Sequence, residues 1–97
     1  MEQLTVAQRL YDAFLTDRGI IAHMEAGSEY WQDLREECLA ICREIASEYS
    51  DRDSMPVDLA KNLIMCMEQV TRKIGVSDSY AYFHYDFTRA LGALAGN

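Results

Sequence analysis

The sequence of 97 residues contains one proline and five glycines, and these are the residues that most often interrupt regular backbone structure. It also has few basic residues, with nine lysines and arginines against sixteen aspartates and glutamates and a formal net charge of −7. Neutralising phosphates requires clustered lysine and arginine. The charge balance therefore argues against direct binding of DNA or RNA and against binding to an anionic membrane surface.

No apolar run approaches the roughly 20 residues that a membrane-spanning helix needs. The first residues, Met-Glu-Gln-Leu, do not resemble a signal peptide. With three cysteines, an odd number, and no secretion signal, we expect reduced, buried thiols in a cytoplasmic protein. The length predicts a single domain over residues 1–97, and association is a reasonable expectation for a domain this small.

Catalytic signatures are also missing. His23 and His84 are the only histidines, and neither lies in a local catalytic motif. The chain has no glycine-rich phosphate loop and no Glu-x-x-His pair of the kind that binds iron in helical bundles. The sequence therefore predicts no catalytic residue and no cofactor, and it favours a protein that is not an enzyme.

What the sequence does contain is apolar residues recurring every three or four positions, the spacing that places side chains on one helical face. We expect four main helices at about 5–18, 28–50, 56–74 and 78–95, with a short helical or irregular segment at 19–27. Short connections between helices are typical of bundles, so the predicted fold is all-α, a compact helical bundle. The segment 28–50 should be central and should pair with 56–74 through the tight 51–55 connection.

Several residues mark the expected helix starts. Thr5 and Gln8 have the spacing of a capping box. Ser28 follows a glycine and suits the N-cap of the central helix. Pro56 is expected at the first position of the next helix, and Ser77 or Asp78 should begin the last.

Two glycines mark expected helix ends. Gly19 and Gly75 follow helical segments, where a left-handed residue often ends a helix, and Val76 could make the hydrophobic contact of a Schellman motif.

The aromatic stretch at 80–87 allows two interpretations. Its tyrosines and phenylalanines favour a strand, but a lone strand has no partner elsewhere in the chain. As a helix, it places one apolar face inward, formed by Tyr80, Phe83, Phe87, Leu91 and Leu94. We therefore predict a helix.

Four residues on predicted inward faces or their borders, Cys38, Cys42, Cys66 and His84, could converge in a bundle, as zinc ligands do. Their spacing is not that of a zinc knuckle, and cysteine is among the residues most often buried as a small hydrophobe. We favour core thiols and predict no metal site. A small ligand held among Tyr80, His84, Cys66 and Cys38 remains an alternative.

The outward face of the last helix is the best functional clue. If Phe83 and Phe87 point inward, then the outward side chains are Tyr82, Tyr85, Asp86 and Arg89. Tyrosine and arginine are enriched in the energetic centres of protein interfaces, so this face is a predicted partner-binding site.

A second candidate is an acidic row on the central helix, formed by Glu29, Asp33, Glu37, Glu44 and Glu48. Like charges at helical spacing repel one another, and a partner with a basic groove would relieve this repulsion. An ordinary solvated helix face is the alternative explanation.

We therefore expect a protein that acts by binding another protein, as an adaptor or an inhibitor. One form of this hypothesis is a phage or mobile-element inhibitor of a nucleic-acid-binding host machine. Self-association into a homodimer is the simplest form. The alternatives are a bundle that binds a small ligand or metal and a structural subunit of a larger assembly.

Overall fold

The computed structural model describes residues 4–52, 54–76 and 78–92. The elements are α1 (Val6–Phe14), α2 (Ile20–Glu25), α3 (Trp31–Tyr49), α4 (Val57–Lys73) and α5 (Asp78–Ala90). The predicted all-α bundle is confirmed, and residues 80–87 are helical. The predicted end of the last helix near 95, with Leu94, and the candidate cap Ser77 lie outside the described residues.

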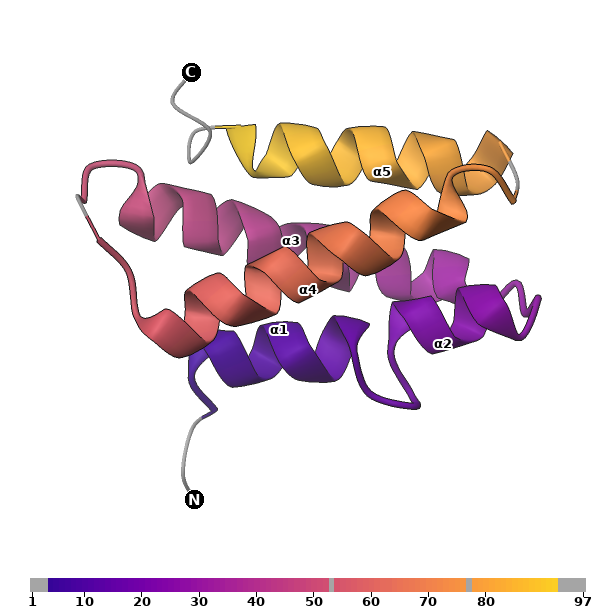
Figure 1. Cartoon of the computed structure of the whole chain (residues 1–97), viewed down its shortest axis with the longest axis horizontal. Helices are drawn as coiled ribbons and strands as arrows, with labels where there is room; N and C mark the ends of the chain where they lie inside the picture. Colours follow the sequence, from indigo (N-terminus) through magenta and orange to yellow (C-terminus); the bar gives the residue numbers. More distant parts are fainter. Residues whose placement is uncertain (1–3, 53, 77, 93–97) are drawn as a thin grey trace.

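Four helices pack in a cycle, α1 against α3, α3 against α5, α5 against α4 and α4 against α1. Figure 1 shows α4 crossing in front of α3, with α5 along one side and α1 and α2 along the other. Both α3 and α4 pack mainly against α1 and α5 rather than against each other, while α2 contacts α1, α3 and α4. The expected direct pairing of the two long helices is therefore wrong. The periodicity of each helix identified a buried face without identifying the helix that covers it.

Aromatic rings fill the centre of this arrangement. The Phe14 ring of α1 lies 6.2 Å from that of Phe83 and 5.3 Å from that of Phe87, measured between centroids. Trp31 of α3 packs edge-on against Tyr80, with centroids 5.2 Å apart. Burying large aromatic side chains supplies much of the hydrophobic stabilisation of a small core. Because these rings fix the inward face of α5, they also fix its outward face.

The first helix begins as predicted and ends early. The Thr5 hydroxyl accepts a hydrogen bond from the Gln8 amide at 3.2 Å, and the Gln8 side chain accepts one from the Thr5 amide at 2.9 Å. The helix ends at Phe14, four residues before the expected boundary at 18. Gly19 was predicted to be left-handed, but its backbone is extended, with φ −80°. A Cβ atom there would lie 2.7 Å from the carbonyl carbon and oxygen of Phe14, so the glycine permits a close approach of two backbone segments.

The other predicted helix ends need smaller corrections. Helix α3 begins at Trp31 and not at Ser28, with Tyr30 as its N-cap. The Ser28 hydroxyl accepts from the Tyr30 amide at 3.1 Å and does not cap the helix. Pro56 is the N-cap of α4 and not its first helical residue. Gly75 is not left-handed and Val76 is exposed, so the expected Schellman contact is wrong.

Candidate functional site

Helix α5 has two chemically distinct faces. Tyr80, Phe83 and Phe87 are buried, whereas Tyr82 is 71% exposed and Tyr85 is 59% exposed. The two faces follow from the helical phase, since positions 80, 83 and 87 recur at the three- and four-residue steps that share one side of a helix. Tyr82 and Tyr85 therefore remain on the surface, whereas the other Tyr and Phe side chains of α5 are buried.

Arg89 and Tyr85 form a pair on this exposed face. The Arg89 Nη1 atom donates a hydrogen bond to the Tyr85 hydroxyl at 3.3 Å. The guanidinium carbon also lies 5.6 Å from the centroid of the Tyr85 ring. Cation–π contacts at exposed sites contribute about 0.5–1 kcal/mol, enough to bias both side chains towards one arrangement. A face ordered in this way loses less conformational freedom when a partner binds.

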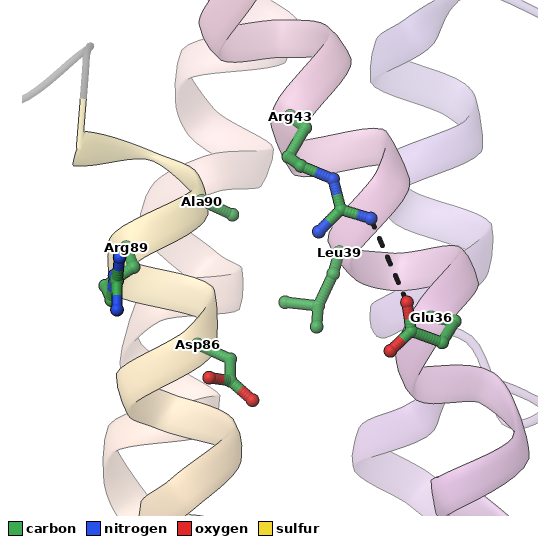
Figure 2. Close-up of a pocket in the computed structure, with 6 residues that line it drawn as sticks. All are labelled: Glu36, Leu39, Arg43, Asp86, Arg89 and Ala90. Atoms are coloured by element: carbon green, nitrogen blue, oxygen red, sulfur yellow. Dashed lines mark ion pairs between the residues drawn. The ribbon is translucent and has the colours of Figure 1, made fainter.

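A hollow of about 400 Å³ lies beside this face, between α5 and α3. We call it the α3–α5 groove, and its lining residues are Glu36, Leu39, Arg43, Asp86, Arg89 and Ala90. Figure 2 shows Leu39 and Asp86 projecting into the space between the two helices, with Arg43 and Glu36 joined along α3. The Arg43 guanidinium lies 3.9 Å from the Glu36 carboxylate. The groove thus combines the carboxylates of Glu36 and Asp86 and the Arg43 guanidinium around a small apolar floor, while Figure 2 shows the Arg89 side chain on the outer side of α5.

The groove extends the site beyond the residues that the sequence predicted. Asp86 and Arg89 were expected to be accessible, and both line the groove. Glu36 and Arg43 were missed, although they are seven positions apart on one helical face. That spacing was the only local signal, and it does not show that α5 lies beside them.

All five residues of the acidic row are exposed, although Glu29 lies in the turn before α3 and not in the helix as predicted, and their charges are not equally free. The Arg9 guanidinium of α1 lies 2.6 Å from the Glu44 carboxylate, and this hydrogen bond lowers the pKa of Glu44. Arg52 lies 4.0 Å from Glu48. The remaining members form no ion pair with another described residue; they are Glu29, Asp33 and Glu37. Glu44 and Glu48 line a hollow together with residues of α1, so this end of the row faces α1, whereas the α3–α5 groove faces α5.

The three thiols behave as core side chains. Burial raises the pKa of Cys38, Cys42 and Cys66, that of Cys42 to about 12. Within the described part of the chain, no group of three or more His, Cys, Asp or Glu residues is arranged to hold a metal ion. The Tyr80 hydroxyl, a candidate contact for a small ligand, donates instead to the Met24 carbonyl oxygen at 3.0 Å.

Comparisons of the chain with models of known protein families, with curated proteins and with solved structures found no match. None of the helices in the described ranges combines the length and apolar character needed to cross a bilayer. Function is therefore inferred from the surface chemistry of this chain alone.

Proposed function

We propose that this protein acts by binding another protein, with the exposed face of α5 at the centre of the contact. The observation that carries the proposal is the exposure of Tyr82 and Tyr85 on one helical face, with Arg89 held against Tyr85. Tyrosine and arginine dominate the energetic centres of interfaces, because they bury large areas and still form directional polar contacts. Tyrosine also loses little rotamer entropy on binding.

The α3–α5 groove supplies a polar border to this contact. Its charged residues, Glu36, Arg43, Asp86 and Arg89, balance one another in a protein whose net charge is −7. A second copy of the chain can approach this region with little of the repulsion that a strongly acidic surface would cause. Self-association through α5 into a two-fold homodimer is therefore the simplest form of the proposal.

The free part of the acidic row offers a second contact for a partner with a basic groove. Glu29, Asp33 and Glu37 are exposed and have no described ion-pair partner, so a basic surface would gain their full attraction. Such an arrangement suits an adaptor, or an inhibitor that occupies a groove normally filled by nucleic-acid phosphates. The buried, protonated thiols favour a non-enzymatic protein in a reducing compartment such as the cytoplasm.

The test is a quantitative pull-down with three forms of the protein. These are the wild type, a Tyr82→Ala/Tyr85→Ala variant and a Val57→Ala/Ile64→Ala control, which removes exposed apolar side chains from α4 instead. Circular dichroism checks that all three stay folded. We expect a partner that the wild type and the α4 control retain and that the α5 variant loses. Equal retention by all three forms would reject α5 as the contact surface.

Light scattering tests the self-association form separately. The homodimer is supported if the mean mass rises towards that of two chains as the concentration increases, and if the α5 variant stays at the mass of one chain. A mass of one chain across the whole series rejects it and leaves a different protein as the partner.

A further inference from the structure

A second surface depression runs along α1, where the helix faces α4. A hollow of about 400 Å³ lies at the junction of α1, α2 and α4, and another of about 260 Å³ lies near the start of α1. Tyr11 lines both hollows, so they adjoin along α1. We call the two adjoining hollows together the α1–α4 groove. It shares no lining residue with the α3–α5 groove.

The floor of the α1–α4 groove is apolar and partly exposed. Leu4, Tyr11 and Met65 are 52%, 43% and 45% exposed, and two further apolar lining residues, Leu15 and Ile21, are half-buried and buried. Single exposed apolar residues are normal on protein surfaces, whereas several that line adjoining hollows indicate an interaction site. Met65 also lies off the core face of α4, and methionine adapts its shape to different partners.

The rim of the groove is acidic. Its charged lining residues are Asp12, Asp17, Glu25 and Asp58, and no lysine or arginine is among the described residues that line it. Glu25 is already paired with Lys73 at 3.1 Å. The other three carboxylates form no ion pair with a described residue. The α3–α5 groove differs in this respect, because its own two carboxylates are matched by two arginines.

We propose that the α1–α4 groove binds a cationic amphipathic helix of a partner protein. An apolar stripe on that helix covers Tyr11 and Met65, and its lysines or arginines meet the carboxylates of Asp12, Asp17 and Asp58. Charge complementarity selects this occupant. Nucleic acid would be repelled by these carboxylates, and a second copy of this chain, with a net charge of −7, would meet here none of the arginines that line the α3–α5 groove. The inference does not depend on the function proposed for α5.

The probe is a synthetic helical peptide of about four turns, with leucines on one face and lysines on the other. Calorimetry measures its affinity for the wild type and for an Asp12→Asn/Asp17→Asn/Asp58→Asn variant. Asparagine at position 58 keeps an oxygen that can accept from the Leu59 amide, as Asp58 does at 2.9 Å. The matched control is Asp51→Asn/Glu68→Gln/Asp78→Asn, which removes the same charge from exposed positions that line neither groove and lie outside the acidic row.

We expect the peptide to bind the wild type, with affinity falling about ten-fold or more in the groove variant and less than about three-fold in the control. When the peptide is added to the wild type, the amide chemical shifts should change mainly in α1 and α4 and not in α5. This measurement does not depend on the folding of any variant. Three results would each overturn the proposal: no binding to the wild type, equal weakening in both variants, or equal binding of a scrambled peptide with the same charge and no apolar face.

Discussion

The hydroxyl of Tyr80 in α5 donates a hydrogen bond to the carbonyl oxygen of Met24 in α2, across 3.0 Å inside the core. The Tyr80 ring also packs edge-on against Trp31 of α3. One side chain thus links three helices. It holds α5 in the rotation that leaves Tyr82 and Tyr85 on the surface.

Removing this hydroxyl should weaken the fold without disturbing the aromatic packing. Met24 keeps one hydrogen bond, because its carbonyl oxygen also accepts from the Gly27 amide at 3.1 Å. We therefore expect Tyr80→Phe to lower the free energy of unfolding by about 1 kcal/mol, measured by urea denaturation. The control, Tyr82→Phe, changes an exposed residue and should cost less than about 0.5 kcal/mol. Equal effects at the two positions would contradict the buried hydrogen bond.

Alanine substitutions along α5 should separate its two faces. Phe87→Ala empties a fully buried site against Phe14 and should cost about 3–5 kcal/mol in unfolding free energy. Tyr85→Ala removes an exposed side chain together with its contact to Arg89 and should cost no more than about 1 kcal/mol. Thermal and urea denaturation measure both. A large loss at Tyr85 would mean that this tyrosine serves the fold rather than a partner.

Two glycines provide a matched pair for testing backbone contact. Gly19→Ala would bring a Cβ atom to 2.7 Å from the Phe14 backbone, which cannot move aside as a side chain can, so we expect a loss of about 2 kcal/mol or more. Gly75→Ala meets no atom within 4 Å and needs no left-handed backbone, so it should be neutral or stabilise by up to about 1 kcal/mol. Equal unfolding free energies for the two variants would refute the close approach.

The buried thiols predict a loss of stability in alkali. Burial raises the pKa of Cys38, Cys42 and Cys66 in the folded protein, whereas unfolded thiols ionise near pH 8.5. The folded state therefore retains protons that the unfolded state releases. This contribution to stability is fully present below about pH 8.5. As the pH rises further it falls by about 1.4 kcal/mol per pH unit for each thiol, until the folded pKa is reached.

Urea denaturation between about pH 8.5 and 10 measures this slope. Cys42→Ala removes one thiol, so its unfolding should release about one proton fewer than that of the wild type. Its unfolding free energy should therefore fall less steeply with pH, whatever its stability at neutral pH. An unchanged slope would show that Cys42 is not held in its protonated form by the fold.

Helical periodicity was sufficient to predict most of the fold. The three- and four-residue spacing of Tyr80, Phe83 and Phe87 identified both the helix and its buried face. It could not reveal why Gly19 is a glycine, because the reason is the nearby backbone of Phe14 in the folded chain. For the same reason it could not show which helices lie side by side.

The candidate surface was partly predictable in the same way. The exposure of Tyr82 and Tyr85 followed from the helical phase of α5 once the strand alternative was set aside. The place of Glu36 and Arg43 in the α3–α5 groove did not follow from the sequence, because it depends on α3 lying next to α5. The ion pair through which Arg9 neutralises Glu44 of the acidic row likewise depends on the contact between α1 and α3.

The most direct test of protein binding through α5 is site-specific photo-crosslinking in cells that contain the protein. A photoreactive amino acid replaces Tyr82 in one sample and Ile64, an exposed residue of α4, in another. We expect a discrete crosslinked species from position 82, either with a second copy of the chain or with another protein, and none from position 64. No species from position 82, or the same species from both positions, would contradict a partner-binding role for this face.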